Sequence, residues 1–100
     1  MLTLLVIVAL VLVGASLADG FSTVHFLKNP GYVEANPLFG PRPSTARIFG
    51  EGMGIIAAEI AAAFLIAWLY APLGWLLIVG GLVQAGLHVH FAIKNYRIPV

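Results

Sequence analysis

The chain has 100 residues, a formal net charge of +1, and 61% hydrophobic residues against 9% Asp, Glu, Lys and Arg. Soluble globular domains carry about a quarter charged residues, so this chain lacks the polar surface of a water-soluble domain. Its basic residues are too few and too scattered for a nucleic-acid partner, and the absence of cysteine excludes disulfides, thiolate zinc sites and cysteine nucleophiles. A very apolar soluble helical bundle would show polar stripes at helical spacing. The composition therefore favours an integral membrane protein whose first partner is the lipid bilayer.

The first apolar run covers residues 2–18 without a charged side chain. At ~1.5 Å per residue it spans most of a hydrocarbon core about 30 Å thick. No helix breaker follows until Asn29-Pro30-Gly31, so we expect a first transmembrane helix over about 2–28, with Asp19 inside the span. A cleaved signal peptide is the alternative, because Ser16 and Ala18 are small, but no Lys or Arg precedes the run.

A proline-rich segment follows, which we expect to form a cytoplasmic loop over about 29–44 on the membrane surface. Its prolines are Pro30, Pro37, Pro41 and Pro43. Ser44 comes directly after Pro41-Arg42-Pro43 and is a candidate N-cap for the second helix.

Residues 60–93 contain no Asp, Glu, Lys or Arg, which is too long a run for one ordinary crossing. Ala71-Pro72-Leu73-Gly74 interrupts it and predicts a tight turn. We therefore expect a second helix over about 45–70, or from Gly52 in a shorter version without the Ser44 cap, a third over about 73–93, and a short basic tail over 94–100. The predicted fold is a single all-α integral membrane domain, 1–100, with three transmembrane helices, the last two forming a tight helical hairpin.

The basic residues all lie in or beside the loop and the tail. They are Lys28, Arg42, Arg47, Lys94 and Arg97. The positive-inside rule then predicts an outside N-terminus, with the loop and the C-terminus in the cytoplasm.

Glu59 lies among isoleucines and alanines about nine positions into the second helix. An ionised carboxylate there costs at least a few kcal/mol unless it is paired, so we expect it to have partners. Gln84 and His88 are four residues apart, as are Asp19 and Thr23, and each pair occupies one helix face. We predict a polar intramembrane cluster in the cytoplasmic half of the bundle: Asp19, Thr23, Glu59, Gln84 and His88.

Two nearby polar residues have different expected places. Glu51 is eight residues before Glu59 and would guard the mouth of the cluster from a similar helix face. His90 would point away from His88 and reach the membrane surface or a neighbouring subunit.

Small residues suggest close helix packing. Gly81 and Ala85 form a small-xxx-small pair on the third helix, and the second helix is rich in alanine over 57–63. Such smooth surfaces serve packing within the chain and docking between chains.

The cluster has three open interpretations. Its side chains are interhelical hydrogen bonds that hold the helices in register, or Asp19 or Glu59 titrates with His88 in proton or ion handling. A metal or cofactor site of His88 with carboxylates is the weakest interpretation, because no H-x-x-H or H-E-x-x-H spacing is present. We assign no metal ligands or catalytic residues, and the sequence leaves any cofactor unknown.

The loop and the residues before it resemble a known signature. Asp19-Gly-Phe-Ser-Thr23 and Gly31-Tyr-Val-Glu34-Ala-Asn36-Pro37-Leu38 are similar to the pattern D-x3-T … G-x2-E-x-N-P-L of a family of small bacterial and archaeal multi-helix membrane proteins of unknown function. The motif residues cover about a fifth of the chain. The resemblance implies a multi-helix fold in a prokaryotic inner (cytoplasmic) membrane and no particular activity.

The loop motif Glu34, Asn36 and Pro37 has two interpretations. Asn before Pro is restricted to extended backbone, and its side chain can bond nearby amides, which suits a turn that folds back onto the helix ends. Alternatively, Glu34 and Asn36 form a lid or ligand contact above Asp19, Glu59 and His88.

These observations favour a non-enzymatic accessory or structural subunit of a membrane protein complex or a homo-oligomer. The alternative is a small oligomeric proton, ion or solute transporter using Asp19, Glu59 and His88. An enzyme is not expected, because no nucleophile stands beside a base and Gly50-Glu-Gly-Met-Gly54 lacks the Lys and the preceding strand of a phosphate-binding loop.

Overall fold

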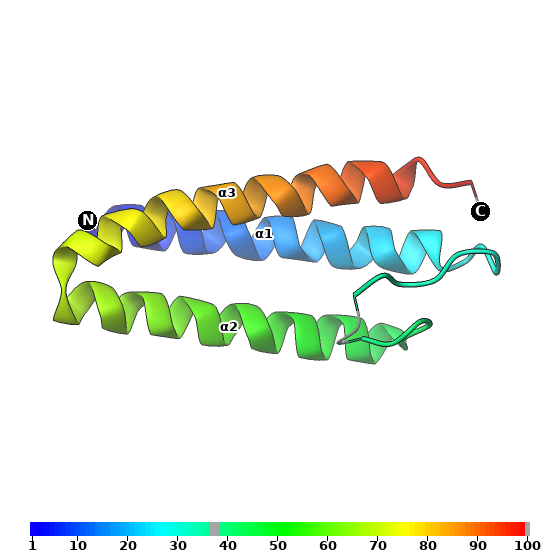
Figure 1. Ribbon diagram of the computed structural model, residues 1–100, viewed down its shortest axis with the longest axis horizontal. Helices are drawn as coiled ribbons and strands as arrows, with labels where there is room; N and C mark the ends of the chain where they lie inside the picture. Colours follow the sequence, from blue (N-terminus) through cyan, green and yellow to red (C-terminus); the bar gives the residue numbers. More distant parts are fainter. Residues whose placement is uncertain (37–38, 100) are drawn as a thin grey trace.

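A computed structural model describes residues 1–36 and 39–99. Over these residues the chain forms three α-helices and no strand: α1 (Leu2–Phe26), α2 (Thr45–Leu69) and α3 (Ala71–Tyr96) (Figure 1). The predicted all-helical architecture is confirmed, and each of these helices is long and apolar enough to cross a membrane.

The start of α2 is set by a side-chain cap, as predicted. Ser44 has extended backbone, and its hydroxyl accepts a hydrogen bond from the amide of Arg47 at 3.1 Å. One of the backbone donors that the first helical turn leaves unpaired is satisfied in this way.

The break between α2 and α3 differs from the predicted turn at 71–74. Tyr70 alone, with φ −150° and ψ 94°, ends α2 and begins α3. Pro72 lies in the first turn of α3, where a missing N–H costs nothing because that donor has no helical partner. The proline therefore starts the helix, and the hairpin turn is a single residue.

The helices form an elongated bundle of 47 × 21 × 17 Å. The N-terminus and the junction of α2 with α3 lie at one end, and the loop and the C-terminus lie at the other (Figure 1). Tyr70 forms this junction. The five basic residues belong to the loop, the first turn of α2, the last turn of α3 and the residues just after α1 and α3, so they gather at the loop end.

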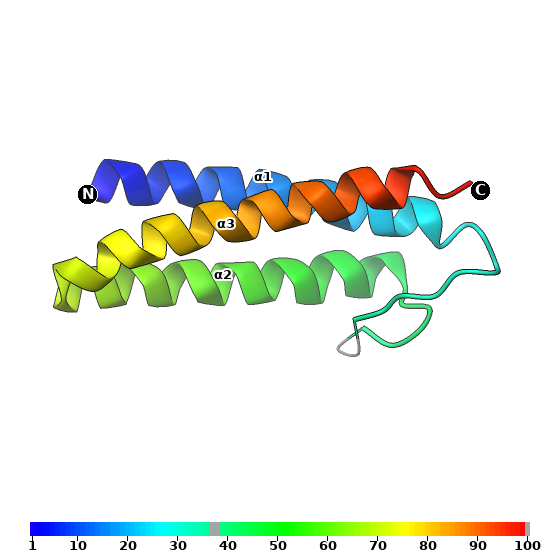
Figure 2. The ribbon, with the colours of Figure 1, turned by 45° about the horizontal axis from the view of Figure 1, so that its top comes forward.

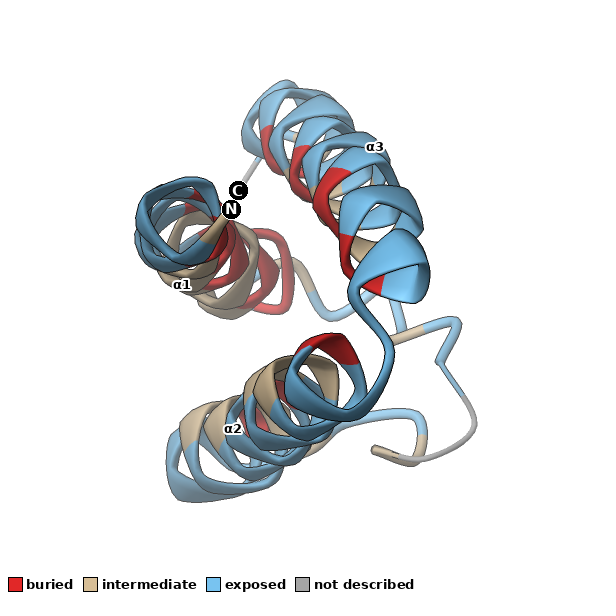
Figure 3. Ribbon diagram, turned by 90° about the vertical axis from the view of Figure 1, so that its left-hand side faces the viewer, coloured by how far each residue is buried: buried red, intermediate tan, exposed pale blue. Residues whose placement is uncertain are grey.

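Helix α3 packs most extensively against α1, while α2 contacts both of them less. In Figure 2, α3 starts beside α2 at the Tyr70 end and lies across α1 toward the C-terminus. Figure 3 shows exposed residues over most of the circumference of α2. Toward the loop end α3 therefore separates from α2, while α2 stays packed against α1 through Ile48, Phe26 and Leu27.

Glycines permit the close contacts between helices. A Cβ on Gly81 of α3 would lie 2.6 Å from Cγ1 of Val8, and a Cβ on Gly20 of α1 would lie 2.8 Å from the ring of Phe49. Real side chains do not approach so closely, so these positions require glycine unless the neighbouring side chain moves. The predicted pair on α3 serves this packing, because Ala85 is buried beside α1 and α2 with Leu12, Ala15 and Ile56.

Much of the apolar surface is left uncovered. In the most apolar 18-residue window of each helix, 22% of α1, 11% of α2 and 17% of α3 is buried. Large exposed side chains include Leu10, Leu65, Leu76 and Val83. A soluble monomer rarely exposes apolar patches of this extent.

Candidate functional site

A pocket of about 740 Å³ opens between the helices at the loop end of the bundle. It reaches from the loop, at Tyr32 to Asn36, down to Ser16 of α1, Glu59 of α2 and Gln84 of α3. The pocket exists because α3 leans toward α1 at this end and leaves space beside α2 (Figure 2). Its size is that of a small-molecule site.

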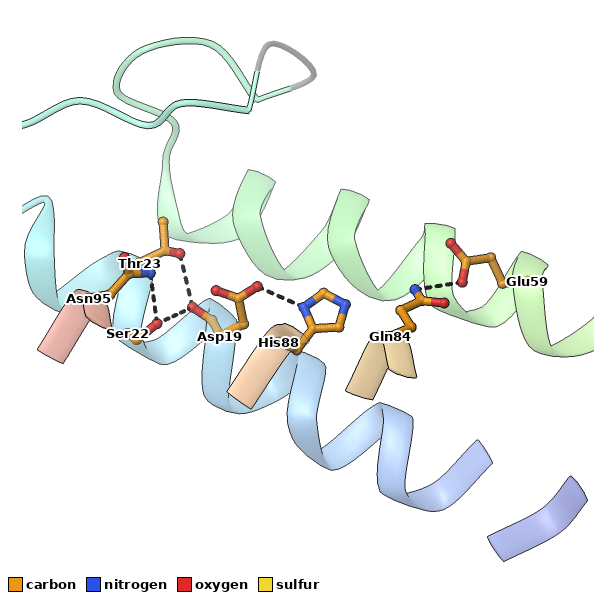
Figure 4. A network of polar contacts seen from close by, with 7 residues as sticks. All are labelled: Asp19, Ser22, Thr23, Glu59, Gln84, His88 and Asn95. Carbon is orange, nitrogen blue, oxygen red and sulfur yellow. Dashed lines mark hydrogen bonds and ion pairs between the residues drawn. The ribbon is translucent and has the colours of Figure 1, made fainter. Parts of the chain in front are cut away.

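Asp19 and His88 join α1 to α3 across this pocket. Oδ2 of Asp19 lies 2.7 Å from Nδ1 of His88, and each side chain is 25% exposed (Figure 4). An ionised carboxylate can only accept hydrogen bonds, so Nδ1 carries the proton and donates it. This hydrogen bond involves a charged group and is shielded from part of the solvent, which makes it one of the stronger contacts in the bundle.

The backbone of the same residue anchors a second set of polar contacts. Ser22 and Thr23 donate their hydroxyl hydrogens to the carbonyl of Asp19, at 2.7 and 2.9 Å. Asn95 of α3 then donates its amide to Oγ of Ser22 at 3.1 Å (Figure 4). Ser22 is fully buried, so this network forms a second polar link between α1 and α3.

The sequence interpretation missed Ser22 and Asn95. Asn95 was assigned to a tail outside the third helix, whereas α3 continues through Tyr96. Helical spacing was the signal that could have found both, since Ser22 is three residues after Asp19 and Asn95 is seven after His88.

Glu59 bonds to Gln84, which lies one turn before His88 on α3. Nε2 of Gln84 donates to Oε2 of Glu59 at 2.8 Å (Figure 4). Glu59 is nevertheless an exposed residue, whereas Gln84 is half-buried. The carboxylate therefore has a hydrogen-bond donor but keeps an open side.

The five residues of the predicted cluster all line the same pocket. They form two separate contacts, because His88 reaches α1 and Gln84 reaches α2 (Figure 4). Asp19 and Glu59 thus approach one face of α3 from its two neighbouring helices, each bonded to a different turn of α3.

The expectation for Glu51 is wrong. Its carboxylate pairs with Nε of Arg47 at 3.1 Å, one turn earlier on the exposed surface of α2. Glu51 is not among the described residues that line the pocket. The ion pair with Arg47 holds its side chain outside the pocket mouth. His90 is exposed and contacts the ring of Phe91.

The loop folds over the mouth of the pocket. Oε1 of Glu34 accepts a hydrogen bond from the amide of Asn36 at 3.0 Å, and the amide of Glu34 donates to the carbonyl of Pro41 at 2.7 Å. Glu34 and Asn36 line the pocket, while Pro37, the third residue of the loop motif, lies outside the described residues. Glu34 and Asn36 therefore form part of the pocket wall.

Arg42 ties this loop to the end of α1. Its guanidinium donates to the carbonyl of Tyr32 at 2.7 Å and to the carbonyl of Leu27. Leu27 is the C-cap of α1, where carbonyls lack helical partners and the helix dipole favours a cation. One side chain thus caps a helix and holds the loop.

Hydrogen bonding is the chemistry that the described residues arrange here. No group of three or more His, Asp or Glu side chains converges as metal ligands within residues 1–36 and 39–99. The carboxylates of Asp19 and Glu59 and the amide of Gln84 are placed to bind a polar or charged group that enters the pocket.

Comparison with models of protein families, with curated proteins and with solved structures finds no match to this chain. The resemblance of residues 19–38 to a family signature therefore stays a prediction.

Proposed function

We propose that this chain is a non-enzymatic integral membrane subunit that assembles, with copies of itself or in a larger complex, through an exposed face of α2. The uncovered apolar surface supports this proposal most directly. Helix α2 buries only 11% of its most apolar window within the chain. Lipid tails or other apolar helices are the environments in which such a surface is stable.

The lengths and the aromatic residues of the helices support membrane insertion. A helix of 25 residues is ~37 Å long, more than the ~30 Å hydrocarbon core. Exposed Trp75 and Tyr96 stand near opposite ends of α3, about 32 Å apart at 1.5 Å per residue. Tryptophan and tyrosine prefer the two membrane–water interfaces, so this separation suits a spanning helix.

The charge distribution supports an orientation. The end of the bundle with the loop and the C-terminus carries Lys28, Arg42, Arg47, Lys94 and Arg97, and the end with Met1 and Tyr70 carries no Lys or Arg. The positive-inside rule assigns the loop end to the cytoplasm.

The proposed assembly surface is a small-residue face on α2, which we define as Gly50, Gly54, Ala57, Ala58 and Ala61. All five are exposed, and a Cβ on Gly50 or Gly54 would meet nothing within 4 Å. At ~100° per residue they occupy about 100° of arc, opposite the buried Ile56 and Ala67. Small residues let two helix backbones approach closely in lipid.

The experiment is disulfide cross-linking in native membranes. The chain has no cysteine, so Ala58→Cys introduces a single thiol on the small-residue face. Ala85→Cys, buried between helices within the chain, is the matched control. We expect oxidation to give a cross-linked dimer with Ala58→Cys and none with Ala85→Cys.

Purification in mild detergent separates the two forms of assembly. A homo-oligomer supports docking between copies, and a stoichiometric second protein that an Ala58→Trp change releases supports a larger complex. A monomer in membranes with no partner and no cross-link at position 58 would contradict the subunit role.

A transporter is the second candidate, and one observation favours it. Asp19, Glu59 and His88 line one pocket that extends from the loop into the bundle. Proteoliposomes test this function: Glu59→Gln should abolish proton or solute flux while the cross-linked dimer still forms. Equal flux with and without protein would remove this candidate.

A further inference from the structure

The pocket has a charge that the subunit role does not use. Three of its side chains are carboxylates: Asp19, Glu34 and Glu59. They accept hydrogen bonds from His88, the amide of Asn36 and the side chain of Gln84. Among the described lining residues, Lys94 is the one lysine or arginine. Even when His88 is counted as a cation, three carboxylates face two positive groups, so the pocket holds an excess of negative charge.

The rest of the lining is largely apolar and aromatic. Rings reach it from α1, α2, α3 and the loop: Phe26, Tyr32, Phe39, Phe49 and Phe91. Aromatic faces attract cations and also cover apolar groups. A hydrated inorganic ion would leave these rings without a complementary surface, while a neutral apolar molecule would leave the carboxylates unused.

The carboxylates are positioned on two sides of the space. His88 holds Asp19 on the α1 side, and Gln84 holds Glu59 on the α2 side (Figure 4). Gln84 and His88 are one helical turn apart on α3. Glu34 lies in the loop that forms the outer wall. A cationic centre between α1 and α2 would face carboxylates from both helices while its body packs on the rings.

We propose that this pocket binds a small amphipathic organic cation, with a positive centre of the ammonium or phosphonium type on an apolar body. A volume of about 740 Å³ is within the range of sites for drug-sized molecules. The carboxylates would select the sign of the charge, and the rings would select an apolar body over a hydrated ion. Binding rests on the pocket of one chain and not on assembly through α2.

The test uses two probes of matched shape and opposite charge, the cation tetraphenylphosphonium and the anion tetraphenylborate. Equilibrium dialysis against the full chain in a neutral maltoside detergent, with protein-free micelles subtracted, measures saturable binding. We expect one phosphonium ion per chain and at least tenfold weaker binding of the borate. Equal binding of both ions, or no saturable binding of the cation, would overturn the proposal.

The matched variants are Glu59→Gln, in the pocket, and Glu51→Gln, outside it on the same helix. The glutamine at position 59 keeps an acceptor for Gln84, so the change removes charge and little else. We expect Glu59→Gln to weaken phosphonium binding about tenfold, the loss of one carboxylate–cation attraction in a partly solvated site. Glu51→Gln should leave it unchanged, and equal effects of the two changes would contradict the assignment.

A second variant keeps the test independent of Glu59. Phe91 is exposed on α3 and lines the pocket, so Phe91→Leu removes a ring without opening the core. We expect several-fold weaker phosphonium binding, with the chain eluting from gel filtration as the unmodified protein does. Unchanged binding with Phe91→Leu and Glu59→Gln together would exclude this pocket. The cross-link at position 58 reports assembly separately, so either proposal can fail alone.

Discussion

The carboxylate of Asp19 and the imidazole of His88 lie 2.7 Å apart although they are 69 residues apart in the chain. Their contact joins the first helix to the last at the loop end, where α3 has diverged from α2 (Figure 2). It therefore stabilises the α1–α3 pair and at the same time fixes one wall of the pocket.

This pair should show energetic coupling. We expect Asp19→Asn and His88→Gln each to lower the free energy of unfolding, and a double-mutant cycle to give a coupling of about 1 kcal/mol, the range found for polar contacts between membrane helices. Unfolding in mixed micelles followed by circular dichroism measures it. Asp19→Asn combined with His90→Gln, an exposed neighbour on α3, is the control. Additive effects in the Asp19–His88 cycle would mean that the contact contributes nothing to stability.

Two adjacent glycines of α3 should respond in opposite ways. A Cβ at Gly81 would lie 2.6 Å from Val8, whereas a Cβ at Gly80 would meet nothing within 4 Å. Gly81→Ala should cost about 1–3 kcal/mol by overpacking, while Gly80→Ala should stabilise α3 by up to about 1 kcal/mol through helix propensity. Thermal unfolding in detergent compares them. Adding Val8→Ala should recover part of the stability that Gly81→Ala loses, because it removes the clashing methyl group. No recovery would mean that the clash with Val8 is not the cause of the loss.

Arg42 should control the order of the loop. Its guanidinium bonds two carbonyls, of Leu27 and Tyr32, and a lysine ammonium lacks the planar fork that reaches both. Losing one hydrogen bond from a charged group, about 1.5 kcal/mol, should speed amide hydrogen exchange in residues 31–36 about tenfold. Mass spectrometry of Arg42→Lys in detergent measures the rate. Arg97→Lys, at the same end of the bundle, should leave exchange in these residues unchanged.

The proposed orientation predicts which end of the bundle can be labelled from outside. Tyr70→Cys stands at the hairpin turn and Thr45→Cys at the start of α2, and both positions are exposed. In intact bacterial cells, a membrane-impermeant maleimide should label Tyr70→Cys and not Thr45→Cys. Inside-out vesicles should give the reverse pattern. Labelling of Thr45→Cys in intact cells would invert the proposed topology.

Local sequence was enough to predict the helices but less reliable for their ends. Long apolar runs and the Ser44 cap act over a few residues, so the all-helical architecture and the start of α2 could be predicted. The predicted turn at 71–74 is misplaced because a proline such as Pro72 occurs both where a helix breaks and in the first turn of a helix. The end of α3 was misplaced because Lys94 was interpreted as the start of a tail, although a basic residue also suits a helix C-terminus.

The pairing of polar side chains had to wait for the tertiary structure. Helical spacing predicted which residues share a face, such as Gln84 with His88, because periodicity is a property of one helix. It did not predict that His88 would meet Asp19 while Gln84 would meet Glu59. That choice depends on the direction in which α3 leans between α1 and α2.

Local sequence specifies long apolar helices and the need of Asp19 and Glu59 for partners, since the cost of leaving water is a local property of each segment. The identity of those partners, the pocket and the uncovered face of α2 arise from the packing of the three helices. These depend on crossing geometry and on contacts such as Gly81 with Val8, which couple residues far apart in the chain.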